Sequence, residues 1–521
     1  MNKIDYNDGR AVVIVGSGAG GGTLANELCQ RGVDVIVLEA GKHYTVDDFV
    51  NDEATMFGRI TWLDKRTMSG DASWVTNRAA PTWTCKTVGG TTVHWAGCCP
   101  RFKEHEFRIA SVYGGIAGAD LMDWPITLKE LAPYYDKAES KMGITGTHGM
   151  PLLPGNNNFK VLQAGAKKLG YKQVSTGHMA INSQARDGRP GCTQLGFCFQ
   201  GCKLGAKWST LYAELPKAEA TGKLDLRPEC MALQIQHDAS GKVTGVLYAD
   251  GSGKQQFQKA RAVCVAGNAV ETPRLLLNSA SSKFPGGLAN SNGAVGRYYT
   301  VHATGAVFAV FDKPVHMYRG TTMAGIVEDE SRLDTSRGFV GGYYMEQISV
   351  GAMAFAVTTV PDAWGEEYGQ VLDAYDRVAG IWLCGEDMPL ARNRITLNNS
   401  EKDQYGLPIP HVHIDRHPND IAIVEHSRKQ ATALYEAVGA TKVVQTPAYP
   451  AGHNMGSCRM SAKPADGVVN KWGQTHEVTN LFVSDGSVFT TSAAANPTLT
   501  ITALAIRQAE YIAGQMSRGQ V

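Results

Sequence analysis

The chain has 521 residues, of which 43% are apolar and 19% are charged, and its formal net charge is +1 at pH 7. This composition is typical of a globular protein large enough for two or three structural units. The balanced charge and the lack of a basic run exclude nucleic acid as a partner chosen by electrostatics. No apolar run is long enough to span a bilayer.

Residues 11–40 predict a strand, a glycine-rich turn, a helix and a second strand. In such a unit the first glycine permits a tight turn, the second lets the backbone approach a pyrophosphate, and the third allows close packing of helix and strand. Glu39 ends the second strand, where a carboxylate can accept hydrogen bonds from ribose hydroxyls. The segment therefore predicts a dinucleotide site, without separating NAD from FAD. Its expected contacts are Gly16, Gly18, Ala19, Gly21, Glu39 and Ala40.

The rest of the chain alternates between strands and helices. A loop rich in glycine and threonine spans 85–100, and a helix is predicted at 128–142 with Thr127 as its N-cap. Short or buried strands are expected at 224–227, 232–237, 243–249, 262–266 and 481–483, and helices at 273–277, 418–438 and 497–516. Residues 305–360 have no helical period and predict a sheet, which 394–397 and 410–414 are expected to continue.

Three cysteines, Cys192, Cys198 and Cys202, lie within eleven residues rich in glycine and turn formers. Three thiolates at this spacing suit a 3Fe-4S cluster, or a 4Fe-4S cluster with an outside ligand. Zinc is less favoured, because no fourth Cys or His lies at a suitable spacing. The alternative is a loop with buried free thiols. The eleven cysteines in all show no disulfide framework.

Several motifs occur in order along the whole chain: VGSGAGGG at 15–22, LEAG at 38–41, VGGTTVHWAG at 88–97, AGNAVETPRLLLNS at 266–279, VGR at 295–297, NRITL at 393–397, HNMGSCRM at 453–460, and LFVSDGSVF followed by AAANPTLTITALAIR within 481–507. Together they resemble the glucose-methanol-choline (GMC) flavoprotein oxidoreductases. The resemblance implies FAD rather than NAD, and oxidation of an alcohol, often a sugar or polyol. It implies an α/β fold in which an antiparallel-sheet substrate domain is inserted into a Rossmann-like FAD-binding domain.

The resemblance also implies how the chain is divided into domains. The FAD-binding domain is discontinuous and comprises 1–105, 205–305 and 455–521. A helical and loop insertion that carries the cysteines spans 106–204, and the substrate-binding domain spans 306–454.

His453 is the expected catalytic base. It begins HNMGSCRM, which resembles the family's HPxGTxxM motif except that Asn454 replaces proline. A neutral imidazole can take the hydroxyl proton while hydride leaves the same carbon for flavin N5. Asn496 matches the family's second active-site position. Asn496 and Pro497 also read as N-cap and first residue of the last helix. That helix N-terminus, with Pro497 and Thr498, is expected beside flavin N1.

Other expected FAD contacts lie in two loops: Gly89, Gly90, Thr91 and His94 in the first, and Asp485 and Gly486 in the second. Some family members attach a histidine of the first loop to the flavin 8α-methyl. Two alternatives therefore stay open for His94, a covalent bond or simple packing and hydrogen bonding at the dimethylbenzene edge.

The cysteine spacing resembles that of multi-subunit sugar and polyol dehydrogenases of the family, in which a 3Fe-4S centre passes electrons from FAD to a cytochrome partner. Those chains commonly have proline after the last cysteine, where Lys203 stands here. The predicted function is oxidation of a hydroxyl of a sugar, glycoside or polyol, with electrons leaving through the cluster. Alternatives are an oxidase that reduces O2 to H2O2, an oxidiser of sterols or long-chain alcohols, or a flavin-holding or NAD-sensing protein without catalysis.

Implied partners are a small exported subunit and a cytochrome c subunit or another electron acceptor. Residues 1–10 lead directly into the first predicted strand and have no features of a signal peptide. We therefore expect a periplasmic enzyme co-exported with a partner, or a cytoplasmic one.

Overall fold

The structure is a computed structural model that describes residues 4–71, 82–360, 363–446 and 452–521. Its strands are β1 (Val12–Val15), β2 (Val35–Leu38), β3 (Thr67–Ser69), β4 (Val174–Ser175), β5 (Leu224–Arg227), β6 (Met231–His237), β7 (Val243–Ala249), β8 (Gln255–Lys259), β9 (Ala262–Val265), β10 (Ala303–Val310), β11 (Ile326–Val327), β12 (Tyr343–Gln347), β13 (Val378–Gly385), β14 (Arg394–Lys402), β15 (Pro408–His413), β16 (Lys442–Gln445) and β17 (Leu481–Val483).

The α-helices in the described residues are α1 (Ala19–Cys29), α2 (Glu53–Ile60), α3 (Ile109–Tyr113), α4 (Leu128–Met142), α5 (Asn157–Lys168), α6 (Thr210–Ala213), α7 (Leu215–Ala220), α8 (Asn268–Asn278), α9 (Ala352–Thr359), α10 (Glu366–Asp373), α11 (Pro418–Glu436) and α12 (Thr498–Ser517). Thr127 caps α4, as predicted: its hydroxyl accepts the Glu130 N–H at 3.2 Å. No helix among the described residues has both the length and the apolar character needed to cross a bilayer.

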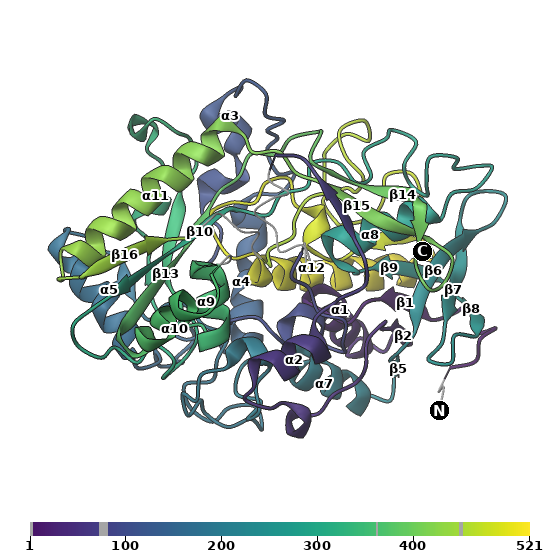
Figure 1. Cartoon of the computed structure of the whole chain (residues 1–521). Coiled ribbons are helices and arrows are strands. Elements are labelled where there is room, and N and C mark those ends of the chain that lie inside the picture. Colours follow the sequence, from purple (N-terminus) through teal and green to yellow (C-terminus); the bar gives the residue numbers. More distant parts are fainter. Residues whose placement is uncertain (1–3, 72–81, 361–362, 447–451) are drawn as a thin grey trace.

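A parallel sheet with the order β17-β9-β1-β2-β5 forms one end of the molecule (Figure 1). β1 is its central strand and pairs in parallel with both β2 and β9. All four residues of β9 are buried, and so are those of β2, because helices cover such a sheet on its faces. The sheet thus joins strands from both ends and the middle of the chain, which confirms the predicted α/β class.

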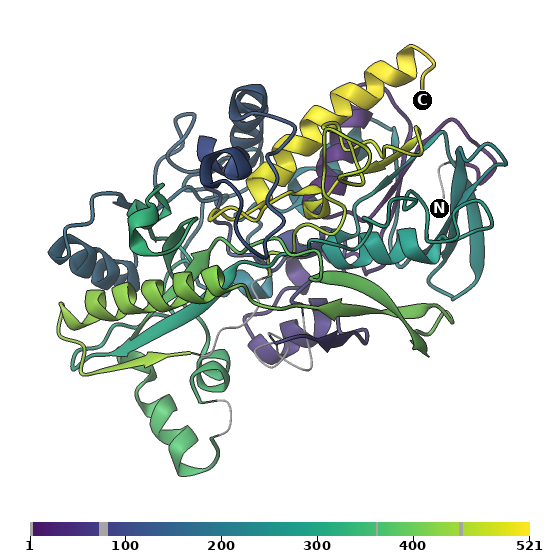
Figure 2. The same cartoon turned by 90° about the horizontal axis from the view of Figure 1, so that it is seen from above.

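An antiparallel sheet with the order β16-β10-β13-β12-β11-β4 forms the other end (Figures 1 and 2). β10 and β13 pair over their full lengths, and α11 packs along them. The predicted extension was wrong: β15 pairs with β14 on one side and with β3 on the other, in a separate three-stranded sheet. β6, β7 and β8 form another.

Residues 352–359 form the helix α9, although the sequence predicted only sheet structure over 305–360. The eight residues read AMAFAVTT and are apolar on nearly every side. A helix without a polar face has no 3.6-residue period, so periodicity could not reveal it.

Two other helices begin at unpredicted residues. α8 begins at Asn268, ahead of Pro273, because the Asn268 side-chain oxygen accepts the Val270 N–H at 2.9 Å. α12 begins at Thr498 with Pro497 in the N-cap position, so the prediction of Asn496 as N-cap was wrong. The Asn496 side chain instead donates a hydrogen bond to the buried carboxyl group of Glu346.

The glycine-rich turn after β1 is held by close backbone packing. Gly16 has φ +97°, a conformation that residues with side chains rarely adopt. A Cβ on Gly21 would lie 2.1 Å from the Gly16 oxygen, and one on Gly20 would lie 1.6 Å from the Ser484 oxygen. The start of α1 is therefore locked against β1 and against the end of β17.

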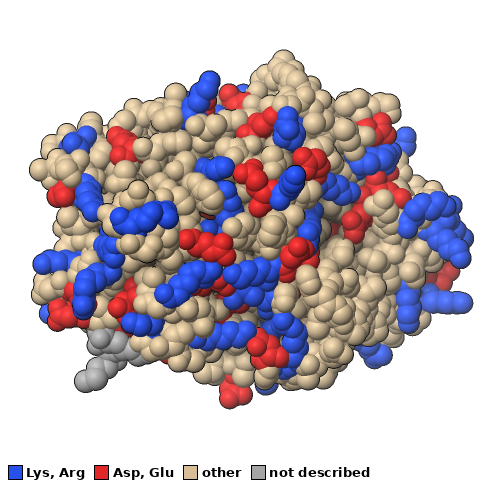
Figure 3. All heavy atoms as spheres, turned by 180° about the vertical axis from the view of Figure 1, so that it is seen from behind, with Lys and Arg blue, Asp and Glu red and all other residues tan. Residues whose placement is uncertain are grey.

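Charged side chains of both signs are intermingled on the face drawn in Figure 3. This distribution agrees with the net charge of +1 and provides no single-sign surface on that face.

Candidate active site

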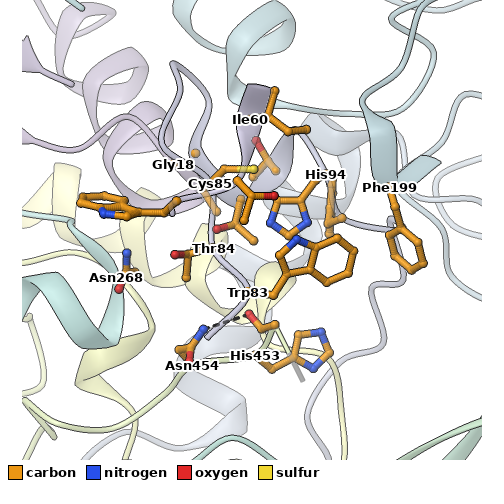
Figure 4. Close-up of a pocket in the computed structure, with 18 of the residues that line it drawn as sticks. Gly18, Ile60, Trp83, Thr84, Cys85, His94, Phe199, Asn268, His453 and Asn454 are labelled. Atoms are coloured by element: carbon orange, nitrogen blue, oxygen red, sulfur yellow. Dashed lines mark hydrogen bonds between the residues drawn. The ribbon is translucent and has the colours of Figure 1, made fainter. Parts of the chain in front are cut away.

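A cavity of about 1260 Å³ lies between the parallel and antiparallel sheets. It is large enough for a dinucleotide and a small second ligand, since drug-sized ligands occupy roughly 300–1,000 Å³. Figure 4 shows Gly18, His94, His453 and Asn454 around one part of it. Of the predicted residues, the cavity is lined by Gly16, Gly18, Ala19, Glu39, Ala40, Gly90, Thr91, His94, His453, Asp485, Gly486, Asn496, Pro497 and Thr498.

Gly18 and Gly90 bring two loops together at the cavity wall. A Cβ on Gly90 would lie 2.8 Å from the Gly18 Cα. A Cβ on Gly18 would have only one atom within 4 Å, the Gly90 Cα at 3.9 Å. The space beside Gly18 is therefore open and belongs to the cavity. Gly21 and Gly89 do not line the cavity and contribute through packing instead.

Glu39 is buried at the carboxyl end of β2 and lines the cavity, as predicted. One carboxylate oxygen accepts the Ser17 N–H at 3.0 Å and its hydroxyl at 2.7 Å, and the other accepts the Gly41 N–H at 2.9 Å. Burial raises the pKa of Glu39. The sequence did not indicate Ser17, whose hydroxyl oxygen also accepts the Gly89 N–H at 2.9 Å.

His94 lies on the cavity wall with its ring stacked on Trp83 at a centroid distance of 4.4 Å. The ring is 2% exposed, and neither nitrogen has a hydrogen-bond partner among the described residues. Burial lowers the pKa of His94 to about 3, so the ring is neutral at physiological pH. A buried imidazole without partners is a group that a ligand in the cavity can satisfy.

His453 projects from the loop that follows the antiparallel sheet (Figure 4). The Trp382 ring packs against it at a centroid distance of 5.5 Å, and its Nδ1 lies 3.2 Å from Nδ1 of His302. Burial and the neighbouring His302 hold the pKa of His453 well below its usual value. A neutral imidazole of this kind can accept a proton from a ligand in the cavity.

Asn454, which replaces the proline of the family motif, fastens this loop by hydrogen bonds. Its side-chain oxygen accepts the Tyr299 hydroxyl, and its amide donates to the Gly452 oxygen at 3.4 Å (Figure 4). The stiffness that proline would supply through its ring is therefore supplied here by side-chain contacts.

Asn496 lies between the cavity and a fully buried carboxyl group, Glu346 of β12. Its Nδ2 is 3.4 Å from Oε2 of Glu346, while its Oδ1 has no partner within the described residues. Burial raises the pKa of Glu346 to about 8, although the bonds from Asn496 and Cys98 lower it. The carboxyl group is thus predominantly protonated at neutral pH and orients the amide of Asn496.

Replacing Glu346 with glutamine is expected to make thermal stability less sensitive to pH. A carboxyl whose pKa is raised in the folded state favours folding at low pH, and this advantage is lost as pH rises from about 4.5 to about 8. The melting temperature of Glu346→Gln, relative to the unmodified protein, should therefore increase between pH 5 and pH 8. Calorimetry at both values measures it, and a parallel response of the two proteins would contradict the assignment.

The three predicted metal ligands lie outside the cavity. Cys192 and Cys202 accept backbone N–H groups at their sulfur atoms, from Gln194 at 3.3 Å and Lys207 at 3.5 Å. Burial raises the pKa of Cys192 to about 12; the Gln194 N–H opposes this shift, and the neighbouring Cys198 and Cys202 add to it. Phe199, from the same segment, reaches the cavity and packs against Trp83.

Lys207 connects the cysteine segment with the loop that carries His94. Its buried ammonium group donates to the carbonyls of Val93, Trp95 and Cys198 at 2.6–2.8 Å. Burial lowers the pKa of Lys207 to about 8, and the nearby cysteines oppose this shift.

Besides Ser17, the sequence analysis missed three residues of the site: His302, Glu346 and Lys207. His302 stands seven residues after the start of the VGR motif, and Glu346 stands within an apolar strand, so both can be found in the sequence. Nothing in their local pattern tells which distant loop each will meet. Lys207 could have been predicted as part of the site, because it lies only five residues after the last clustered cysteine.

Comparison with known proteins agrees with this geometry. The two halves of a GMC oxidoreductase family model match residues 33–304 and 389–505. The chain is 34% identical to 2-methyl-1,2-propanediol dehydrogenase of Mycolicibacterium austroafricanum, over 97% of this chain and 95% of that protein. It is 28% identical to the fructose dehydrogenase large subunit of Gluconobacter japonicus, over 98% of each.

Solved structures show the same fold at low identity. A formate oxidase of Aspergillus oryzae with an R554A substitution superposes with a TM-score of 0.71 and 16% identity, over 99% of this chain and all of that one. Pyridoxine 4-oxidase of Mesorbium loti gives a TM-score of 0.65 and 18% identity, over 96% and 98%. The chain therefore belongs to the GMC oxidoreductases, FAD-dependent enzymes that oxidise CH–OH groups of alcohols or sugars.

Proposed function

We propose that the chain is a dehydrogenase that oxidises a hydroxyl group of a small diol, polyol or sugar, with His453 as the base. The observation that carries this proposal is the position of His453. Its neutral imidazole shares one cavity with the glycine-rich turn, Glu39 and the N-terminus of α12. A bound flavin supplies the hydride acceptor.

The residues around the cavity fit FAD. The open space beside Gly18 at the start of α1 suits a pyrophosphate, since a helix N-terminus offers free N–H groups. Of the about four lone-pair sites of a carboxylate, Glu39 uses three for protein hydrogen bonds and keeps one for a ribose hydroxyl. Asp485, Gly486 and the first residues of α12 are the proposed contacts for the ribityl chain and ring. His94 is the proposed contact at the dimethylbenzene edge.

His453 and Asn496 are the proposed catalytic pair. The imidazole takes the hydroxyl proton, which makes the carbinol carbon a better hydride donor. Asn496 has an unpartnered Oδ1 at the cavity, so its amide can hydrogen-bond the substrate hydroxyl and align the C–H bond. The protonated Glu346 behind it keeps negative charge away from the developing alkoxide.

Within this substrate class, the cavity wall favours a short diol with a hydrocarbon part over a sugar. Residues 318–382 contribute a wall that is mainly aliphatic and aromatic, including Tyr318, Met323, Ile348, Val350, Ala354 and Trp382. The polar side chains of this wall are few among the described residues: Tyr318, Ser349, Thr358, Tyr375 and Asp376, and the Tyr375 hydroxyl already donates to the Val350 oxygen at 2.6 Å. A sugar has more hydroxyls than a short diol to pair with these groups, and each one left unpaired is costly. The 2-methyl-1,2-propanediol dehydrogenase relative supports this choice.

We expect kcat/KM for 2-methyl-1,2-propanediol to exceed that for fructose by about 10-fold or more, because a methyl group in an apolar pocket is worth roughly 10–200-fold. Steady-state assays with a dye acceptor measure both. Val350→Thr places a hydroxyl in the wall and should narrow the preference, whereas His476→Gln, outside the cavity, should preserve it. Faster turnover of fructose would contradict this choice of substrate.

We further propose that Cys192, Cys198 and Cys202 hold a 3Fe-4S cluster that carries electrons from the flavin to an external acceptor. N–H groups directed at two of the sulfurs and the buried Lys207 cation both favour thiolate ligation. Phe199, next to Cys198 in sequence, lines the cavity and packs against Trp83, so this segment adjoins the space proposed for the flavin.

Protein purified anaerobically is expected to contain about three irons per chain, as a 3Fe-4S cluster requires. Cys198→Ser should lose iron, while Cys29→Ser, at the end of α1, should retain it. Iron-free protein that still turns over rapidly with O2 and releases peroxide would instead favour an oxidase of the same family. Preference for a long-chain alcohol or a sterol would identify the other alternative.

A further inference from the structure

His302 sits directly behind His453 in a strained and firmly held position. Its φ is +72°, a left-handed conformation that residues with side chains rarely adopt. The carboxylate of Asp387 accepts the backbone N–H of Val301 at 2.9 Å and that of His302 as well. The fold therefore maintains this conformation with a dedicated buried carboxyl group, as is common at functional positions.

The hydrogen bonds of His302 determine its tautomer. Its Nε2 lies 3.1 Å from the backbone oxygen of Ser492, and a carbonyl oxygen can only accept. The proton is therefore on Nε2. Burial lowers the pKa of His302 to about 4, so the ring is neutral and its Nδ1 carries a lone pair.

Two groups face that lone pair. Nδ1 of His453 is 3.2 Å away, and Sγ of Cys384 is 2.9 Å away. Because Nδ1 of His302 is an acceptor, Nδ1 of His453 must be the donor in their hydrogen bond. The hydrogen bond of the His453 ring to the described residues is made at Nδ1, and the residue lines the cavity.

We propose that His302 is a positioning residue that holds His453 in the Nδ1-protonated tautomer, so that the lone pair on Nε2 of His453 points into the cavity. The chain of bonds runs from His453 Nδ1–H to His302 Nδ1, and from His302 Nε2–H to the Ser492 oxygen. The role depends on the proposed function, because His453 can serve as base only with a free Nε2.

Cys384 competes for the same acceptor. Its thiol is a weak donor, so it yields to the imidazole N–H. A hydroxyl at this position would compete more strongly and would release His453 to the opposite tautomer. We therefore expect the Cys384→Ala protein to reduce its flavin faster than the Cys384→Ser protein, although serine is nearer to cysteine in shape.

The kinetic test uses the flavin-loaded protein under anaerobic conditions. His302→Leu removes the acceptor and should slow flavin reduction about 10-fold or more, with little change in substrate KM. His302→Asn keeps an oxygen near the former Nδ1 and should recover much of the rate. Equal rates for these two variants, or a serine variant as fast as the alanine variant at position 384, would overturn the proposal.

The tautomer can also be read without turnover. In ¹⁵N-histidine-labelled protein, the ring signals of His453 are those lost in His453→Gln. We expect a protonated Nδ1 and an unprotonated Nε2, and the reverse pattern in His302→Leu. A protonated Nε2 in the unmodified protein would refute the assignment even if alcohol oxidation is established. The expected pattern without any alcohol oxidation would instead contradict the proposed function alone.

Discussion

Replacing His453 with glutamine is expected to lower the rate constant for flavin reduction by an alcohol about 10²–10⁴-fold, the usual contribution of a positioned base. Glutamine can hydrogen-bond a hydroxyl but cannot take its proton at neutral pH. The substrate must then lose hydride from the neutral alcohol, which raises the barrier by about 3–5 kcal/mol. Rapid mixing under anaerobic conditions measures this step separately from reoxidation.

Two controls test whether the slower reduction is specific to the loss of the His453 base. Flavin content should be unchanged in His453→Gln, since the proposed role of this residue, which packs beside Trp382, is toward the substrate and not the flavin. His476→Gln removes a half-buried imidazole bonded to Ser461, outside the cavity, and is expected to react at the normal rate. A His453→Gln protein that reduces its flavin as fast as the unmodified chain would exclude His453 as the base.

The substitution Gly18→Ala is expected to give a folded protein that binds FAD poorly. The φ of Gly18 is −66°, which any residue adopts, and a Cβ there meets only the Gly90 Cα at 3.9 Å. The methyl group instead occupies cavity space proposed for the pyrophosphate. Overpacking of this kind costs about 1–3 kcal/mol, equivalent to a roughly 5- to 150-fold loss of affinity. Flavin titration of the apoprotein measures it.

Two other glycines provide controls. Gly58 lies in α2, where a Cβ added to it would have no atom within 4 Å, and Gly58→Ala should bind FAD normally. Gly21→Ala would place its Cβ 2.1 Å from the Gly16 oxygen, so it should lower the melting temperature strongly. Normal flavin affinity in Gly18→Ala would show that the pyrophosphate lies elsewhere.

Local sequence patterns predicted the first βαβ unit well. The run from Val12 to Glu39 has its own period, turn glycines and terminal acid, and each feature depends on neighbours close in the chain. The helices α4 and α11 were also predictable, since each has an N-terminal signal and a long amphipathic or polar pattern.

Features that depend on distant contacts were not predictable. The start of α12 moved because the Asn496 side chain turns toward Glu346, which is 150 residues away in sequence. His302 and His453 are 151 residues apart, and only the folded chain brings their rings together. The pairing of β15 with β3, which set the third sheet apart, is likewise non-local. The local pattern of a single sequence does not show which distant residues will be in contact.

Anaerobic titration of the purified, FAD-loaded protein with 2-methyl-1,2-propanediol, followed by visible absorption, tests the central claim most directly. The account predicts that the oxidised flavin bands bleach on addition of the diol without any other reductant, and that the same additions leave the His453→Gln protein oxidised over the same interval. A protein that holds flavin but keeps it oxidised with diols, polyols and sugars alike, or one that cannot be loaded with flavin at all, would contradict it.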